Sequence, residues 1–121
     1  MARPAHVRDA LTALLPERHA WTVDSAHASL NARAVTADRA SVHRAFTRLV
    51  DDGEAQRFEL DGRAYFERRA DHHEHVVCDD CGVVAPVPGC VVDEARVARS
   101  TGFTVTGHSV TVRGRCGACS R

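Results

Sequence analysis

Three stretches in the first half of the chain carry apolar residues at helical spacing. The first, residues 4–15, ends at a proline, and its apolar positions are Val7, Ala10, Leu11, Leu14 and Leu15. The second follows Thr22, which can cap a helix, with Trp21 before the cap and Ala26 and Leu30 as its stripe. The third, residues 39–51, is the most regular, at i, i+3, i+4, i+7 and i+8: Val42, Ala45, Phe46, Leu49 and Val50. The pattern therefore predicts three helices, the third ended by Gly53.

A β-hairpin is predicted directly after these helices. Phe58 and Leu60, then Ala64 and Phe66, alternate around Asp61-Gly62, a dipeptide typical of a two-residue hairpin turn. Three helices and a hairpin are the order of a winged helix-turn-helix, whose third helix enters the DNA major groove. The side of that helix away from its apolar stripe carries hydrogen-bonding groups, and we expect double-stranded DNA to be contacted by Ser41, His43, Arg44, Thr47 and Arg48.

The polarity changes after Phe66, which predicts a DNA-binding domain at 1–66 and a second domain at 67–121. The second domain has the pattern strand, strand, helix, strand, with strands at 76–77, 83–84 and 110–112 and a helix over 91–100 closed by Gly102. The fold class is therefore α+β. A domain of about 55 residues with one short helix has a thin core and usually needs a metal, a disulfide or a partner chain.

Composition narrows the class of protein. Sixteen basic residues, all Arg, balance sixteen acidic ones, so any nucleic-acid surface must come from local placement of arginine. No stretch approaches the ~18 apolar residues of a membrane span, and no signal-peptide core is present, which favours a cytoplasmic protein with no membrane partner. Five Cys in such a chain, four of them in Cys-x-x-Cys pairs, indicate metal ligation and not disulfides.

The two Cys-x-x-Cys pairs form a set of four sulfur ligands: Cys78, Cys81, Cys116 and Cys119. Four thiolates suit a closed, tetrahedral Zn²⁺ site, and a site without an open position is structural. Gly82 and Gly117 each follow a pair, where a tight turn is needed. The alternative, free buried thiols, explains this arrangement less well.

A second group of metal ligands is the segment His72-His73-Glu74-His75. If the segment is extended, alternate residues face opposite ways, so His73 and His75 share one face and His72 and Glu74 the other. Each pair then needs partners from elsewhere. The candidates are Glu67 and His19 for the first face, and His108, Cys90, Asp93 or Glu94 for the second; a His-rich turn without metal is the alternative.

An enzyme is not expected, and no residue is assigned a catalytic role. His72-His73-Glu74 matches the His-x-Glu of zinc deaminases, with Cys78-x-x-Cys81 as a possible second ligand pair. Only three residues separate the two motifs, however, whereas in deaminases they begin separate helices. The fifth cysteine, Cys90, is either a small buried residue, a soft metal ligand or a redox-active thiol.

Three segments together resemble the ferric uptake regulator family of metal-dependent bacterial repressors. Residues 40–46, Ala-Ser-Val-His-Arg-Ala-Phe, look like the recognition-helix signature Thr-Val-Tyr-Arg-x-Leu, and Asp51-Asp52-Gly53 resembles the acidic-Ala-Gly that follows it. Residues 72–82 are similar to the family's His-rich segment and first Cys pair. Residues 107–119 resemble its last strand and second Cys pair. The resemblance covers nearly the whole chain.

The resemblance implies a homodimer with an N-terminal winged helix and a small α/β dimerisation domain that holds structural zinc. It implies a regulatory metal at a hinge, held by Glu67, His73 and His75 with a ligand from the first domain, and an additional site of His72, Glu74, His108 and a helix ligand. The family's hinge histidine aligns with Ala20, so His19 is offered as its substitute. The recognition-helix Tyr is replaced by His43. A short segment after Cys81 brings Cys90 near the position of the family's Glu ligand.

The expected function is metal-dependent repression of metal-homeostasis genes, without a small-molecule substrate. Nitrogen and carboxylate ligands at the hinge suit Fe²⁺, Mn²⁺ or Zn²⁺. Glu67, where zinc regulators of the family usually have Cys, argues for iron, whereas Cys90 and the C-terminal Cys pair favour zinc, and zinc is our preference. The alternatives from other classes are a zinc-binding interaction module without DNA affinity and a metal buffer.

Overall fold

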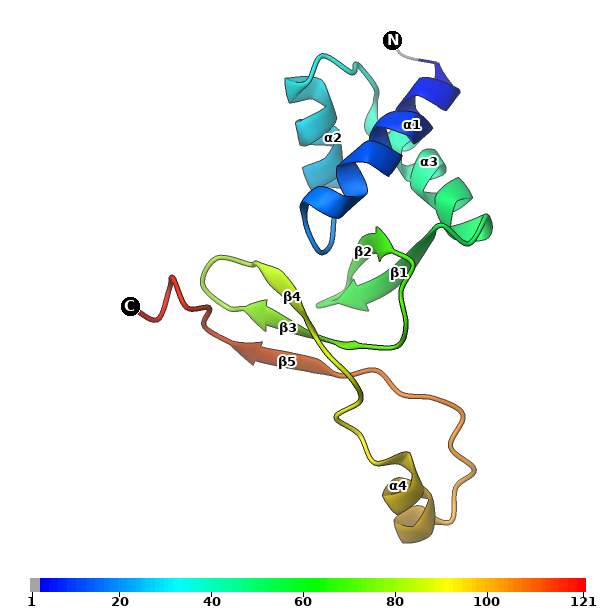
Figure 1. The fold of residues 1–121 in the computed structure, drawn as a ribbon, viewed down its shortest axis with the longest axis vertical. Helices are drawn as coiled ribbons and strands as arrows, with labels where there is room; N and C mark the ends of the chain where they lie inside the picture. Colours follow the sequence, from blue (N-terminus) through cyan, green and yellow to red (C-terminus); the bar gives the residue numbers. More distant parts are fainter. Residues whose placement is uncertain (1–2) are drawn as a thin grey trace. The chain divides into compact units, whose positions relative to one another are not determined.

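The computed structural model describes residues 3–121, which form two compact units, one up to Ala70 and one from Asp71 to Arg121 (Figure 1). The first unit contains α1 (Pro4–Leu14), a 3₁₀ turn η1 (Leu15–Glu17), α2 (Val23–Ala32), α3 (Arg39–Asp51), β1 (Ala55–Leu60) and β2 (Arg63–Arg68). The second contains β3 (Glu74–Cys78), β4 (Val84–Val87), α4 (Glu94–Thr101) and β5 (Thr111–Gly114). The boundary predicted after Phe66 falls inside β2.

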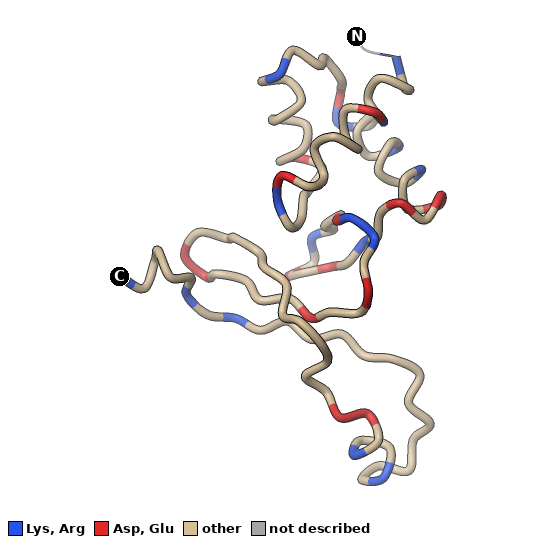
Figure 2. The backbone as a smooth tube through the Cα atoms, in the orientation of Figure 1, with Lys and Arg blue, Asp and Glu red and all other residues tan. Residues whose placement is uncertain are grey.

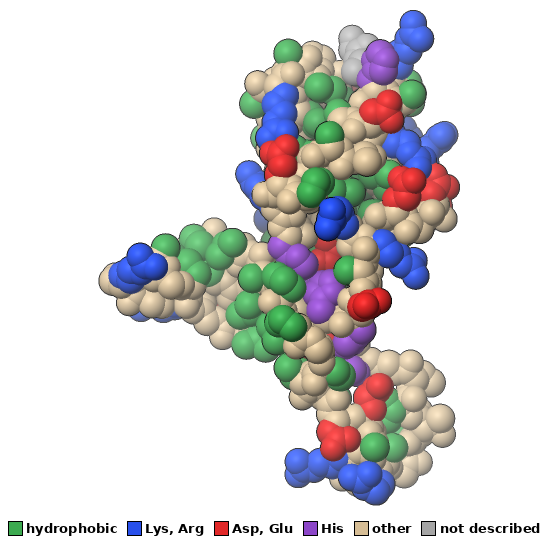
Figure 3. All heavy atoms as spheres, in the orientation of Figure 1, with side chains coloured by type: hydrophobic (Ala, Val, Ile, Leu, Met, Phe, Trp, Pro, Cys, Tyr) green, Lys and Arg blue, Asp and Glu red, His purple; other side chains and the backbone are tan. Residues whose placement is uncertain are grey.

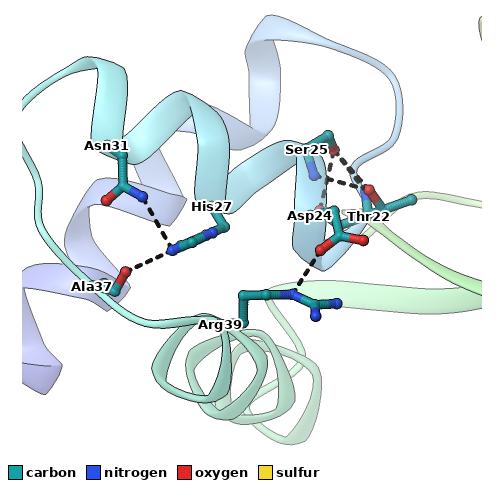
Figure 4. Close-up of polar contacts among 7 residues, drawn as sticks. All are labelled: Thr22, Asp24, Ser25, His27, Asn31, Ala37 and Arg39. Carbon is teal, nitrogen blue, oxygen red and sulfur yellow. Dashed lines mark hydrogen bonds and ion pairs between the residues drawn. The ribbon is translucent and has the colours of Figure 1, made fainter.

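The helices of the first unit begin where the sequence provides caps. The Thr22 hydroxyl accepts from the Ser25 amide at 3.0 Å while the Ser25 hydroxyl accepts from the Thr22 amide at 2.9 Å, a reciprocal capping box (Figure 4). Asp38 caps α3 by accepting from the Ser41 amide at 2.7 Å. The α3 range agrees with the predicted 39–51.

The turn that joins α2 to α3 is held by side chains of both helices (Figure 4). The Nε2 of His27 lies 2.8 Å from the carbonyl oxygen of Ala37 and 3.1 Å from the Asn31 amide nitrogen. At the other end, Arg39 pairs with Asp24 at 2.6 Å. These contacts fix the start of α3 relative to α2.

The core of the first unit lies beneath α3 and the hairpin. Phe46 and Phe66 stack with their ring centroids 4.4 Å apart, and both are fully buried. Trp21 joins them and exchanges two backbone hydrogen bonds with Phe66, of 2.8 and 2.7 Å. The hairpin turn has φ of 54° at Asp61 and 76° at Gly62, as the Asp-Gly signal predicts. This core holds α3 with its polar face outward.

The second unit is a three-stranded sheet of order β4-β3-β5, in which β3 pairs antiparallel with β4 and parallel with β5. Helix α4 begins at Glu94 and not at the predicted residue 91, because the Asp93 carboxylate accepts from the Arg96 amide and caps it there. Gly102 ends the helix in the left-handed conformation, as predicted. None of the helices in the described chain is long and apolar enough to span a membrane.

The two units differ in how much apolar surface they bury. Almost all buried apolar side chains of the described chain belong to the first unit, whereas Val77 and Cys78 alone represent the second. Hydrophobic side chains of the second unit instead appear at its surface (Figure 3), and the large exposed ones are Val83, Val91, Val97, Phe103 and Val112. The second unit therefore needs stabilisation from a source other than its own apolar core.

Candidate metal centres and nucleic-acid interface

Helix α3 carries arginines along its length (Figure 2). His43, Arg44, Thr47 and Arg48 are all exposed, whereas the apolar stripe on the other side of α3 is buried. Arg44 donates to the Ser41 hydroxyl at 3.1 Å, and the Thr47 hydroxyl donates to the His43 carbonyl at 3.0 Å. All five predicted DNA-contacting residues therefore lie on α3.

A cavity of about 410 Å³ adjoins this face, lined by Pro4, Ala5, Arg8, Ser41, Arg44, Ala45 and Arg48. Arg8 of α1 was not predicted from the sequence, because nothing in the α1 pattern distinguishes it from an ordinary surface arginine. Its guanidinium pairs with Asp52 at 2.5 Å and Glu54 at 3.1 Å, next to the end of α3. The bond to Asp52 raises the pKa of Arg8, which stays charged.

The four paired cysteines converge in the second unit. Their four sulfur atoms all lie within 4.8 Å of one another, from Cys78, Cys81, Cys116 and Cys119. The Cys116 amide donates to the Cys78 sulfur at 3.3 Å, and the Cys81 amide does so at 3.5 Å. These bonds lower the pKa of Cys78 to about 6, while contact with the Cys116 thiol raises the pKa of Cys119 to about 12. A cation is therefore required to hold all four sulfurs as thiolates, and this donor set fits tetrahedral Zn²⁺.

An arginine, Arg115, reinforces the arrangement of the Cys pairs. Arg115, just before the second pair, bonds Asp80 between Cys78 and Cys81 at 2.8 Å and also donates to the Cys119 carbonyl at 2.8 Å. The contact with Asp80 joins segments that the chain separates by more than thirty residues. The spacing of the cysteines predicted the cluster, but it gave no indication of this link.

The other cysteine, Cys90, lies in a second ligand cluster of the same unit, together with His72 and His108. The Cys90 sulfur is 3.2 Å from the Nε2 of His108. The Glu74 Oε1 lies 2.6 Å from His72 Nε2 and 3.2 Å from His108 Nε2, and the Glu74 side chain is only 1% exposed. Its second oxygen has no hydrogen-bond partner among the described residues. A buried carboxylate between two imidazoles, with one oxygen unused, fits a bound cation.

The structure separates the remaining candidates for that cluster. Glu94 approaches His108 on the opposite ring nitrogen, with its carboxylate 3.5 Å from Nδ1. Asp93 caps α4 instead. Of the four predicted candidates for this face, Cys90 and His108 lie with His72 and Glu74, and Glu94 lies behind the ring of His108.

Each unit also contains one pair of the residues predicted for a hinge site. In the first unit, His19 Nε2 lies 2.8 Å from the carboxylate of Glu67, which is 2% exposed and also accepts from Gln56 at 2.7 Å. In the second unit, the rings of His73 and His75 are 4.7 Å apart at an edge-on angle. The alternation predicted for residues 72–75 is seen, since His72 meets Glu74 while His73 meets His75.

Comparison with known proteins gives consistent matches along the chain. A sequence profile of the Ferric uptake regulator family matches residues 2–113. The ferric uptake regulation protein of Bordetella parapertussis is 31% identical over 104 residues, which are 83% of this chain and 75% of that protein. That of Vibrio parahaemolyticus is 33% identical over 86 residues, 66% of this chain and 58% of that protein.

Solved structures of similar fold include regulators associated with different metals. The Vibrio cholerae ferric uptake regulator is 25% identical with a TM-score of 0.73 and covers 96% of this chain and 91% of its own. FurB from M. tuberculosis, described as a zinc uptake regulator, is 26% identical with a TM-score of 0.55, covering 97% and 95%. With its winged-helix unit, its four-cysteine cluster and these matches, the chain belongs to the ferric uptake regulator family of metal-responsive regulators.

Proposed function

We propose that this protein is a zinc-responsive transcriptional repressor that binds operator DNA as a homodimer. The observation that carries the proposal is the exposed polar face of α3, on a helix whose opposite face is packed into a core. Such a helix can enter a major groove without disturbing its own unit. The metal-ligand clusters of the second unit supply the response to metal.

Arg44 and Arg48 are assigned to guanine edges or phosphates, and His43 and Thr47 to base edges. Ser41 lies in the first turn of α3, where its hydroxyl also orients the Arg44 guanidinium. The Arg8 guanidinium beside the same cavity is paired with Asp52 and Glu54, so its charge is balanced there, and Arg44 and Arg48 carry the positive charge of this surface. Because the whole chain is neutral, this local grouping is what attracts DNA.

For regulation, we assign the hinge metal to His19 and Glu67 of the first unit and His73 and His75 of the second. Each pair is already formed within its own unit. A cation that binds both pairs restricts the angles available between the units. It favours DNA binding to the extent that it binds more tightly to the arrangement that fits DNA than to other arrangements. The metal would supply this bridge, whereas the zinc held by four cysteines maintains the second unit throughout.

Zinc is favoured as the regulatory ion because a soft sulfur donor, Cys90, belongs to the second ligand cluster. The resemblance to the mycobacterial zinc uptake regulator supports the same choice. A response to Fe²⁺ or Mn²⁺ is the second candidate, because the hinge ligands are nitrogen and oxygen only and Glu67 is a buried carboxylate. We give preference to zinc because of the sulfur donor in the second cluster.

A homodimer is supported by the apolar surface of the second unit. Val91, Val97, Phe103 and Val112 are between 41% and 73% exposed although the unit has almost no core of its own. Burial of large apolar side chains against a second copy stabilises by about 1.5–3 kcal/mol each. Two copies would also present two α3 helices to successive major grooves.

Selection of a DNA duplex from a randomised pool, followed by fluorescence anisotropy with and without added Zn²⁺, tests the proposal. Arg44→Ala and Arg48→Ala should each weaken binding by about 1–3 kcal/mol if they contact bases, or lower the salt dependence by about one unit of slope if they contact phosphates. Arg99→Ala, an exposed arginine on α4, is the matched control and should leave affinity unchanged.

His73→Ala removes one ligand of the hinge metal and none of the four cysteines. The variant should therefore lose the Zn²⁺ dependence of DNA binding and keep the four-cysteine zinc. Selection of no duplex by the metal-loaded protein would contradict DNA binding and favour a zinc-binding interaction module. A stronger response to Fe²⁺ or Mn²⁺ than to Zn²⁺, at equal free metal, would favour the second candidate.

A further inference from the structure

We propose that His27 is a positioning residue for DNA recognition, because its ring holds the carbonyl group of Ala37 directly before the cap of α3. Through this bond the first turns of α3, which carry Ser41 and Arg44, take one fixed position relative to α2. The inference rests on the proposed function, since it concerns how the first unit meets a DNA duplex. It involves none of the metal ligands assigned above.

The connection between α2 and α3 is tied to α2 at both of its ends. At its start, the Val35 amide donates to the Leu30 carbonyl at 2.9 Å, and Ala34 takes a left-handed conformation with φ of 62°. At its end, the Nε2 of His27 reaches the Ala37 carbonyl at 2.8 Å (Figure 4). The start is held by a backbone bond that any residue type could make, whereas the end depends on a side chain.

The chemistry of this contact determines which ring nitrogen carries a proton. A carbonyl oxygen only accepts hydrogen bonds, so the Nε2 of His27 must donate to Ala37. A protonated Nε2 cannot also accept from the Asn31 amide nitrogen, 3.1 Å away, so Asn31 meets this proton with its oxygen after a half-turn of its amide group. Because Ala37 is only 4% exposed, water cannot readily replace the donor when the ring is removed.

A chain of contacts leads from this carbonyl to a side chain that we assign to DNA. The residue after Ala37 is Asp38, whose carboxylate accepts from the Ser41 amide at 2.7 Å. The Ser41 hydroxyl in turn accepts from the Arg44 guanidinium at 3.1 Å. Hydrogen bonding by Ser41 lowers the pKa of Asp38, and the charges of Arg44 and His27 act in the same direction, so these groups gather around one carboxylate. A shift of Ala37 therefore moves the cap and, through it, Arg44.

The position of α3 matters more for base contacts than for phosphate contacts. A hydrogen bond to a base edge forms only when the side chain meets a fixed pattern of donors and acceptors in the groove. Attraction to phosphates is electrostatic and independent of sequence, so it tolerates a displaced helix. Loss of the His27 bond should therefore reduce the preference for one duplex over others, and not the attraction to DNA in general.

The test compares the affinity of the full-length, metal-loaded protein for the selected duplex with its affinity for a scrambled duplex of the same composition, at one salt concentration. In His27→Ala, the ratio of the two affinities should fall about tenfold, because a buried carbonyl loses its donor. His27→Gln, whose side-chain amide can donate to the same carbonyl, should recover the ratio to within about threefold of wild type. Asn31→Ala is the matched control, since it removes a neighbour of the same ring but no bond to the Ala37 carbonyl, and it should leave the ratio unchanged.

Two further measurements test the route of the effect and the position of the proton. The effects of His27→Ala and Arg44→Ala on affinity for the selected duplex should be non-additive by at least about threefold, because both act through the same guanidinium. Imidazole ¹⁵N NMR at about pH 8, where an imidazole is ordinarily neutral, should show the ring proton of His27 on Nε2. The His27→Gln spectrum assigns this signal by its absence. Urea unfolding followed by Trp21 fluorescence verifies that each variant is folded under the binding conditions.

The outcomes separate this inference from the proposed function. Equal losses of affinity for the selected and the scrambled duplex in His27→Ala would overturn the inference, since they would indicate a general loss of folded protein. An unchanged ratio in His27→Ala, additive effects with Arg44→Ala, or a ring proton on Nδ1 would overturn it as well. In each of these cases a wild type that selects a duplex leaves the proposed function in place, whereas a wild type that selects no duplex refutes the proposed function itself.

Discussion

Removal of the zinc that we propose at Cys78, Cys81, Cys116 and Cys119 should unfold the second unit and leave the first unit folded. The second unit buries two apolar side chains among the described residues, Val77 and Cys78. Each contributes about 1.5–3 kcal/mol at most, against an ordering cost of about 1–2 kcal/mol for every residue fixed. Structural zinc in small domains binds with an apparent free energy of about 10–16 kcal/mol. This is as large as the roughly 5–15 kcal/mol by which whole domains are stable, so its loss should be decisive.

Hydrogen exchange followed by mass spectrometry measures both units in one experiment. After zinc is stripped by a strong chelator in the presence of reductant, amides of β3 should exchange at the rate of unstructured peptide, while amides of α3 keep their protection. The single tryptophan, Trp21, is 1% exposed and belongs to the first unit, so its emission should stay that of a buried indole. Restoring Zn²⁺ should restore protection of β3.

Two results would refute this reasoning. Protection of β3 in a preparation shown by elemental analysis to lack zinc would mean that another interaction, such as a dimer interface, stabilises the unit. Exposure of the tryptophan together with loss of β3 would mean that the first unit depends on the second. The variant Cys116→Ser provides a check that does not involve a chelator, and it should show the same selective loss of β3 protection.

Three further predictions concern the first unit. Phe46→Ala removes a fully buried ring and should lower the free energy of unfolding by about 3–5 kcal/mol, measured by tryptophan fluorescence in urea; no loss would refute the core assignment. The hydrogen bond from the Ser41 amide lowers the pKa of Asp38, so the cap stabilises the folded protein above the unfolded-state pKa of this carboxyl and loses that effect as the pH falls through its folded-state pKa. The difference in free energy of unfolding between wild type and Asp38→Ala should therefore disappear in acid. A difference that persists in acid would contradict the cap. Gly62→Ala, at φ of 76°, should cost about 1–2 kcal/mol by thermal denaturation, while Gly107→Ala, a glycine without positive φ, should not.

The first unit could be predicted closely because its signals are local. The range of α3 follows from five apolar residues at regular spacing, whereas the Asp38 cap was recognised only in the structure. The hairpin follows from Asp61-Gly62, since both residues adopt the positive φ that this turn requires. In both places the residue type and the local backbone conformation agree, so no tertiary information was needed.

The metal clusters were predictable only in part, because they depend on contacts between distant segments. The pairing of His72 with Glu74 follows from strand alternation, but four candidates remained for their partners. The sequence could not show that Glu94 lies behind the His108 ring. Arg8 was missed for a related reason, as its place beside α3 depends on how α1 packs and not on its own sequence context.

The contrast between the two units has a consequence for regulation. An apolar core fixes the first unit whether or not metal is available, so metal cannot act by folding the DNA-binding surface. We propose that it acts instead through the ligands of the second unit and the hinge metal. Linkage then requires that DNA tighten the regulatory metal by the same factor by which the metal tightens DNA. A Zn²⁺ titration with and without saturating duplex should give a factor above one for the wild type, and in His73→Ala this factor should fall to one; a His73→Ala protein that keeps the wild-type factor would exclude the hinge as the coupling element.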